Sequence, residues 1–176
     1  IMISRSMMQL YGDTSGLEVV PPKKDWTLKK WVQWRNNSPD KLKLEQYKKL
    51  YEDQRDTSTP AGMTHLLVKL QNASMINEKN RDLLLDIMSH SWGDRLSKLL
   101  PKNVKVAHKT GTWWDNNVKG AEYYYTNDVG IITLPSEKGE LAISIFTSSN
   151  KGSSSKKQME ALSKAAKIIY DEFSFM

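Results

Sequence analysis

The most chemically loaded segment of the chain is Lys-Thr-Gly-Thr, at residues 109–112. It follows a short run of alternating apolar and polar residues (VKVA), a pattern that predicts a strand. On a strand, Lys109 would supply an ammonium group, and Thr110 and Thr112 would supply hydroxyls. Gly111 would leave room for a ligand to lie against the backbone. Together these groups suit the binding of a carboxylate.

The composition is that of a globular protein and excludes several other classes. The 176 residues are enough for one domain with a real core, and too few for two comfortable ones. Hydrophobic residues make up 39% and charged residues 26%, which argues against disorder. The longest apolar runs are only a few residues, so we expect no membrane span.

The net charge of +6 could attract nucleic acid, an anionic membrane or small anions. The lysines occur in scattered pairs, near acidic residues or in helix-like segments, which indicates a solvated surface. We therefore expect no nucleic-acid partner, because such a domain would gather its charge on one face beside exposed aromatic residues. Cysteine is absent, and the three histidines, His65, His90 and His108, lack metal-ligand spacing. We expect neither a metal nor a cofactor.

Helical patterns fill the first half of the chain. Ser38-Pro39-Asp40 predicts a helix that is capped by Ser38 and runs to about Tyr51. A turn at residues 55–60 would cap the following helix. The expected helical segments are residues 1–10, a short helix in the Trp-rich stretch within 11–37, and residues 40–51, 60–72, 78–90 and 93–100.

Strand patterns dominate the second half. They cover residues 104–111, 122–134 and 140–148, with a hairpin turn at 136–139 and a final amphipathic helix at about 154–173. This order indicates an α+β fold in which helices flank an antiparallel sheet. We predict one domain over residues 1–176, mainly helical over 1–103, with the sheet and the C-terminal helix in 104–176.

Taken together, these segments resemble the penicillin-recognising serine hydrolases, most closely the class A β-lactamases. The resemblance covers roughly residues 50–173. It is carried by RDTSTP (55–60), VAHKTGT (106–112), TNDVG (126–130) and ELAISIF (140–146). It implies a β-lactamase/transpeptidase-like fold. In that fold these segments are the end of the Ω-loop, the third motif on the inner strand, the next strand, and the last strand before the C-terminal helix.

The resemblance also implies roles for individual residues. In this family a serine attacks a β-lactam or acyl-D-alanine carbonyl, and a lysine one helical turn later assists proton removal. The 109–112 segment would then bind the substrate carboxylate. Arg95, fourteen residues before Lys109, would be an auxiliary arginine behind that strand, with a surface ion pair as the alternative. Ser6, about one hundred residues before the third motif, would be a proton relay, with a plain helix-surface serine as the alternative.

Two departures from the family pattern bear on activity. The Ser-x-x-Lys nucleophile should precede the second motif, but such pairs occur only at Ser38/Lys41, Ser148/Lys151, Ser153/Lys156 and Ser154/Lys157, none suitably placed. Because the chain also starts as if within an element, we expect a domain that is incomplete at its N-terminus and inactive as this fragment. Lys43 stands where the family carries the glutamate that activates the deacylating water, so an acyl-enzyme would hydrolyse slowly.

The leading hypothesis is therefore a class A β-lactamase-like serine hydrolase that binds β-lactams or peptidoglycan-type acyl-D-alanyl peptides. One alternative is a D,D-carboxypeptidase or penicillin-binding relative, which the missing glutamate favours. Another is a non-catalytic binding module of the same fold. The resemblance alone implies a periplasmic or secreted bacterial location, and the oligomeric state stays open.

Overall fold

A computed structural model describes residues 1, 3–17, 21–113, 124–149 and 155–176 of the chain. The described residues fall into two compact units, one within residues 1–58 and the other from residue 59 onward. We call these the N-terminal unit and the sheet unit and describe each by itself. The single domain expected from the sequence stays a prediction.

The N-terminal unit consists of short helices. These are α1 (Met7–Thr14), the 3-10 turn η1 (Lys23–Asp25), α2 (Leu28–Asn37) and α3 (Asp40–Glu52). The small core of the unit forms around Trp31 and Tyr47, which are 3% and 2% exposed. Trp31 meets Trp26 and Trp34 edge to face, with ring centroids 5.7 and 5.1 Å away. The tryptophan-rich stretch thus contains the helix α2, with Trp26 just before it, and Trp31 belongs to the core.

Ser38 does not cap α3 as predicted. Pro39 occupies the cap position of α3 without a side-chain hydrogen bond. The Ser38 hydroxyl instead donates to the Trp34 carbonyl at 2.9 Å, at the C-terminal end of α2. That carbonyl lies in the last turn of α2, where backbone oxygens lack partners within the helix, and the serine satisfies it.

The sheet unit contains three helices and three strands. They are α4 (Pro60–Gln71), α5 (Glu78–Ser89), β1 (Val106–Trp113), β2 (Tyr124–Thr133), β3 (Glu140–Ser149) and α6 (Ser155–Phe175). Thr59 caps α4 by accepting from the Gly62 amide at 3.0 Å, as the turn pattern predicts. The α+β fold with an antiparallel sheet is confirmed.

The short helix expected at residues 93–100 is wrong, because residues 95–99 form an irregular turn. Gly93, at φ +102°, sets the backbone in a conformation that no helix uses. The Leu96 amide donates to Asp128, and the Arg95 carbonyl accepts from Ser163. These backbone groups are committed to side chains of the sheet and of α6 rather than to a helix of their own.

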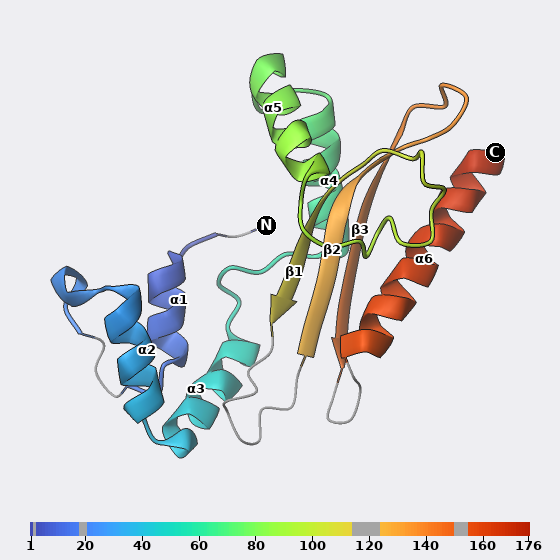
Figure 1. Cartoon of the computed structure of the whole chain (residues 1–176). Coiled ribbons are helices and arrows are strands. Elements are labelled where there is room, and N and C mark those ends of the chain that lie inside the picture. The colour runs from blue at the N-terminus through green and yellow to red at the C-terminus, as the bar shows by residue number, and fades with distance from the viewer. Residues whose placement is uncertain (2, 18–20, 114–123, 150–154) are drawn as a thin grey trace. The chain divides into compact units, whose positions relative to one another are not determined.

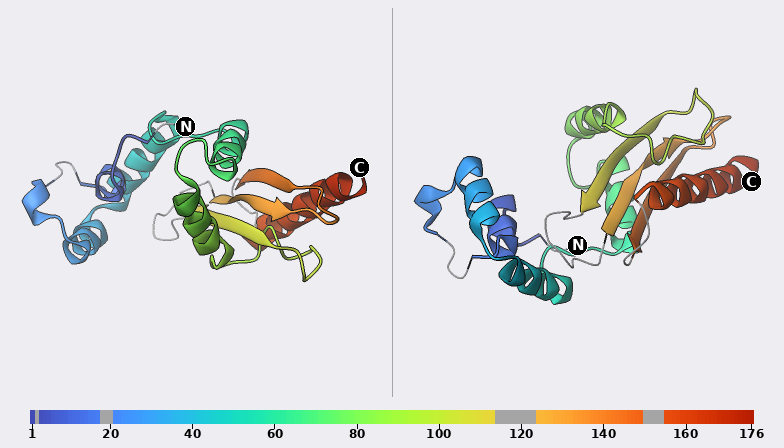
Figure 2. Two further views of the ribbon diagram at one scale, coloured as in Figure 1. Left: turned by 90° about the horizontal axis from the view of Figure 1, so that it is seen from above. Right: turned by 60° about the horizontal axis from the view of Figure 1, so that its bottom comes forward.

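The sheet has the order β1-β2-β3, with both neighbouring pairs antiparallel. Helix α6 runs along one face, and α4 lies on the other (Figure 1, Figure 2). On the α6 face the core joins Leu96 and Leu100 of the turn to Ile132, Ile143 and Leu162. On the opposite face Leu67 and Leu70 of α4 and Met88 of α5 pack around Ile131. Among the described residues, no helix is both long and apolar enough to cross a membrane.

Candidate functional site

The residues of the Lys-Thr-Gly-Thr segment divide between the two faces of β1. Val106 packs on the α6 face and Ala107 on the α4 face, and side chains alternate from there along the strand. Lys109 therefore shares the face of Ala107, whereas Thr110 and Thr112 share the face of Val106. The side chains that are predicted to act together therefore lie on opposite faces of an edge strand, Lys109 on one and the two threonines on the other.

Lys109 lies exposed at the free edge of β1. The Thr133 amide donates to the Lys105 carbonyl, so every second residue from Lys105 bonds toward β2. The backbone groups of Thr110 and Thr112 consequently point away from β2. The Lys109 ammonium donates to the Thr110 carbonyl at 2.6 Å, which places this cation beside those outward groups.

Arg95 lies on the other side of the segment and contacts it directly. Its Nη1 donates to the carbonyls of Gly111 and Asn127 at 2.9 and 3.0 Å. Its Nη2 donates to the Thr112 hydroxyl oxygen at 2.6 Å. Arg95 is only 6% exposed, so the alternative of a surface ion pair is wrong. The turn at 95–99 thus brings Arg95, Gly111 and Thr112 together.

Among the described residues, no carboxylate forms a salt bridge with the buried guanidinium of Arg95. Its three acceptors in this part of the chain are all neutral. Burial lowers the pKa of Arg95, and the charges of Asp128 and Asp94 offset this only in part. An arginine stays protonated even so. A buried cation with neutral partners favours the approach of an anion.

The Thr112 hydroxyl lies between the Arg95 cation and solvent and can donate a hydrogen bond to an anionic ligand. Its oxygen already accepts from Arg95, which leaves its hydrogen free to donate. The side chain of Thr112 is exposed, so the hydrogen can reach an external acceptor. Thr110 differs, because its hydroxyl donates to the Trp92 carbonyl at 3.4 Å. The arrangement can therefore bind a carboxylate through Lys109 and Thr112 with the Arg95 charge behind them.

Sequence reasoning missed a buried histidine–aspartate pair next to this segment. His108 Nδ1 lies 2.9 and 3.0 Å from the two Asp128 carboxylate oxygens, and the residues are 4% and 0% exposed. Gly130 faces His108 across the ladder, and a Cβ there would lie 2.5 Å from the Ala107 carbonyl. The sequence identifies the two strands that carry this pair, but the register that brings the two side chains together comes from the structure.

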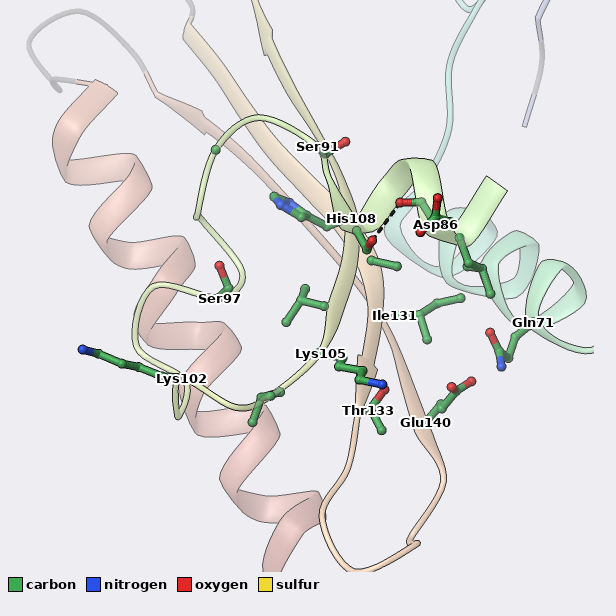
Figure 3. A pocket seen from close by; sticks show the side chains of 16 residues that line it. Gln71, Asp86, Ser91, Ser97, Lys102, Lys105, His108, Ile131, Thr133 and Glu140 are labelled. Carbon is green, nitrogen blue, oxygen red and sulfur yellow. Dashed lines mark hydrogen bonds between the residues drawn. The ribbon is translucent and has the colours of Figure 1, made fainter. Parts of the chain in front are cut away.

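A separate open pocket of about 720 Å³ lies beside β1. Its walls include Asp86 of α5, Ser97 of the turn, Lys105 just before β1 and His108 of β1 (Figure 3). Lys109, Thr110 and Thr112 are not among its lining residues. The groups predicted to bind a carboxylate therefore lie outside this pocket. Among the described residues, no three histidine or acidic side chains gather as metal ligands.

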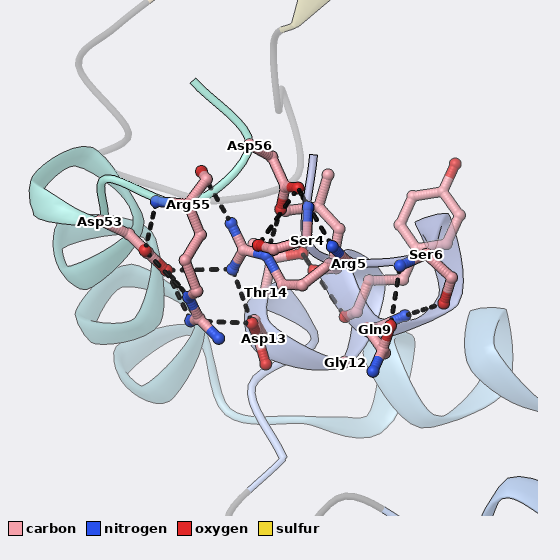
Figure 4. Close-up of polar contacts among 12 residues, drawn as sticks. Ser4, Arg5, Ser6, Gln9, Gly12, Asp13, Thr14, Asp53, Arg55 and Asp56 are labelled. Carbon is pink, nitrogen blue, oxygen red and sulfur yellow. Dashed lines mark hydrogen bonds and ion pairs between the residues drawn. The ribbon is translucent and has the colours of Figure 1, made fainter. Parts of the chain in front are cut away.

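Ser6 is the N-cap of α1 in the N-terminal unit. Its hydroxyl oxygen accepts from the Gln9 amide at 3.3 Å, and the Gln9 side chain accepts from the Ser6 amide at 2.7 Å (Figure 4). This is a reciprocal capping box. The hydroxyl hydrogen remains available, because the serine oxygen acts as the acceptor. The relay role of Ser6 stays a prediction.

A cluster of carboxylates surrounds Arg5 in the same unit (Figure 4). The Nη1 atom of Arg5 contacts Asp13 and Asp53 at 2.7 and 3.0 Å, and its Nε atom contacts Asp56 at 2.5 Å. Burial pulls the pKa of Arg5 down, but the hydrogen bonds to Asp56 and Asp13 outweigh it and the pKa is raised. The Ser4 amide and Arg5 lower the pKa of Asp56 to about 2. The pairing of Asp56 with Arg5 holds the segment before α4 to the start of the chain.

Lys43, in the middle of α3, is 6% exposed. Its ammonium donates to Asp40 at 3.3 Å, one turn earlier in the helix. Its aliphatic stem packs on Gly16, where a Cβ would lie 2.6 Å from Lys43 Cγ. A buried and paired ammonium cannot serve as the general base that a glutamate would provide.

Comparisons with known proteins agree with this architecture. Residues 13–173 match the sequence profile described as the Beta-lactamase enzyme family. The chain is similar to the β-lactamase VEB-1 of Pseudomonas aeruginosa, with 38% identity over 121 residues, 66% of this chain and 38% of that protein. It is also similar to the extended-spectrum β-lactamase PER-1 of Pseudomonas aeruginosa, with 34% identity over 95 residues, 53% of this chain and 30% of that protein.

Solved structures give the same result. The extended-spectrum β-lactamase TLA-3 superposes with a TM-score of 0.59 at 31% identity and covers 66% of this chain and 42% of its own. The chain therefore spans well under half the length of the relatives that it matches. Since the profile covers most of the 176 residues, the chain belongs to the β-lactamase enzyme family.

Proposed function

We propose that this chain binds β-lactams or acyl-D-alanyl peptides through their carboxylate, as part of a class A β-lactamase-type serine hydrolase. The observation that carries the proposal is Arg95, a buried cation whose acceptors in the described part of the chain are all neutral and which donates to Thr112. Membership of the β-lactamase enzyme family suggests the substrate class. Penicillin-type β-lactams and D-alanyl peptides both carry a carboxylate, which this site would bind. The periplasmic or secreted location belongs to the same proposal, and fractionation of the source cells checks it.

Each residue of the segment has a distinct proposed role. Lys109 supplies an exposed ammonium at the edge of β1, and Thr112 donates its hydroxyl hydrogen. Gly111 keeps this part of the edge open and offers its carbonyl to Arg95. Thr110 fixes the loop through Trp92 rather than binding the ligand. Ser6 would relay protons once an acyl donor is bound.

The burial of Lys43 favours a second candidate function. If this position is the one where class A enzymes carry their deacylating glutamate, an acyl-enzyme formed here would persist. Persistent acylation is the behaviour of a penicillin-binding protein or a D,D-carboxypeptidase relative. The ion pair of Lys43 with Asp40 is the specific observation behind this alternative.

An NMR titration with benzylpenicillin tests the binding proposal. We expect amide shifts concentrated at residues 109–112 and a loss of binding in Lys109→Ala. Lys105→Ala is the matched control, because Lys105 is also exposed and lies just before the same strand. Shifts scattered over the surface, or equal losses in both variants, would contradict the proposal.

A fluorescent penicillin and intact-mass measurement separates the hydrolase alternatives. Rapid turnover supports a lactamase, a lasting adduct supports a penicillin-binding protein, and binding without an adduct supports a non-catalytic module. We expect no adduct for these 176 residues, since no Ser-x-x-Lys pair stands where the resemblance places the nucleophile. In the described part of the chain, Ser38 is unsuited to attack because it is 8% exposed and bonded to Trp34.

A further inference from the structure

We propose that His108 and Asp128 are positioning residues that hold Arg95 behind the carboxylate-binding edge of β1. The inference rests on the proposed function and deepens it, because it says how the site fixes its buried cation. Neither residue contacts a ligand in this account. Both act through the turn at 95–99.

Asp128 and His108 pair between the neighbouring strands β2 and β1. Asp128 is completely buried and points from β2 to the α6 face, where it meets His108 at 2.9 Å. A carboxylate can only accept, so His108 Nδ1 carries the hydrogen and donates it. The absence of a side chain at Gly130 leaves room for the backbone and Cβ of His108 opposite it.

The second step connects this pair to the turn. The Leu96 amide donates to Asp128 Oδ2 at 3.2 Å, so the same carboxylate holds His108 and the backbone next to Arg95. From the other side, the Ser163 hydroxyl of α6 donates to the Arg95 carbonyl at 2.8 Å. The backbone around Arg95 is thus fixed at two successive groups, by β2 and by α6.

The third step is electrostatic. Asp128 lies near enough to favour the charged form of Arg95 but does not contact the guanidinium. Among the described residues, the direct partners of Asp128 are the His108 ring and the Leu96 amide. Asp128 therefore supports the cation without occupying the donors that point to Gly111 and Thr112. A direct ion pair would quench the charge that a ligand is proposed to meet.

This arrangement explains why so many polar groups are buried in one small region. His108, Asp128, Arg95 and Ser163 are all between 0% and 6% exposed. Buried polar networks are costly unless every member is satisfied, and apolar residues would give a comparable core more simply. The geometry points to precise placement of Arg95 as the property gained.

The test measures Arg95 directly and needs no ligand. Exchange of the Arg95 guanidinium hydrogens with water is followed by NMR in the wild-type chain and in Asp128→Asn, His108→Leu and Ser163→Ala. We expect slow exchange in the wild type and at least tenfold faster exchange in Asp128→Asn and His108→Leu. Ser163→Ala, which removes the second anchor, should show the same change in smaller degree.

Two further variants separate positioning from general stability. His108→Asn keeps an N–H donor close to the Nδ1 position and should preserve slow exchange within about threefold of wild type. Leu67→Ala creates a cavity in the core on the α4 face of the sheet, opposite the face that holds the network. It should leave Arg95 exchange close to wild type after correction for global opening. Equal acceleration in Leu67→Ala and Asp128→Asn would overturn the inference.

Benzylpenicillin affinity, measured on the same variants, keeps the two proposals apart. Tenfold weaker binding in Asp128→Asn and His108→Leu, with binding retained in His108→Asn, supports both. A wild-type chain that fails to bind, but whose Arg95 loses protection in Asp128→Asn, contradicts the proposed function and supports the positioning role. Unchanged Arg95 exchange in Asp128→Asn overturns the positioning role, whatever the affinity.

Discussion

The two units each bury one arginine and treat its charge in opposite ways. The side chain of Arg5 is 5% exposed and contacts three carboxylates, Asp13, Asp53 and Asp56. Arg95 is 6% exposed and contacts two carbonyls and a hydroxyl. The pKa of Arg5 is raised by its carboxylates, whereas burial lowers the pKa of Arg95. This contrast is what we expect if Arg5 stabilises the fold of its unit and, as proposed, the charge of Arg95 serves a ligand.

The largest expected effect comes from replacing Arg95. Arg95→Met should weaken benzylpenicillin binding about thirtyfold, or about 2 kcal/mol, because the positive charge behind Thr112 is lost. Stability should change by less than about 1 kcal/mol, since removing a buried cation also removes its desolvation cost. Titration calorimetry and urea unfolding of the same sample measure both quantities. A large loss of stability with unchanged affinity would show that Arg95 stabilises the fold and does not serve the ligand.

Replacing Arg5 should show the opposite pattern. Arg5→Met removes the arginine paired with Asp56 and leaves Asp13 and Asp53 paired, among the described residues, with Arg55 alone. The N-terminal unit should therefore lose stability, with a fall in Tm of roughly 5 °C. Benzylpenicillin affinity should change less than threefold. Hydrogen exchange followed residue by residue localises the change, and protection within residues 3–17 and 40–56 should fall while β2 and β3 keep theirs. Lys30→Met, which removes an exposed ion pair with Asp25, is the control.

A smaller effect is expected at the hydroxyl in front of Arg95. Thr112→Val keeps the shape of the side chain but removes the donor to the ligand and the acceptor for Arg95. Binding should weaken about fivefold, or about 1 kcal/mol, which is the usual worth of one hydrogen bond. Thr110→Val is the matched control, because its hydroxyl bonds to the Trp92 carbonyl instead. Equal losses in the two variants would contradict the division of roles.

The smallest expected effect is the dependence of the stability of the N-terminal unit on pH. The pKa of Asp56 is lowered from 3.8 to about 2, first by the Ser4 amide and then by Arg5. A lowered carboxylate pKa adds stability that is complete above 3.8 and is lost as the pH falls toward 2. Protection of the N-terminal unit should therefore decline over that range and do so less in Asp56→Asn. Arg95 stays protonated throughout, so its contacts should not titrate there.

Much of the fold could be predicted from local patterns. The alternation before Lys109, the hairpin turn before Glu140 and the Thr59 cap each depend on residues close together in the chain, and each is confirmed. The Lys-Thr-Gly-Thr segment was likewise evident from residue types alone.

The parts that could not be predicted depend on contacts between distant residues. Arg95 contacts Gly111 from a turn whose backbone bonds to Asp128 and Ser163, and both of these residues come far later in the chain. The partnership of His108 with Asp128 follows from strand register, which no local pattern fixes. The burial of Lys43 depends on a glycine in a separate segment.

One measurement tests the central claim most directly. Benzylpenicillin and its methyl ester differ in charge at a single group, and their affinities are compared for the wild-type chain and for Arg95→Met. We predict that the wild type prefers the free carboxylate at least tenfold and that Arg95→Met abolishes the preference. An equal preference in both proteins would show that the buried charge of Arg95 does not recognise the carboxylate.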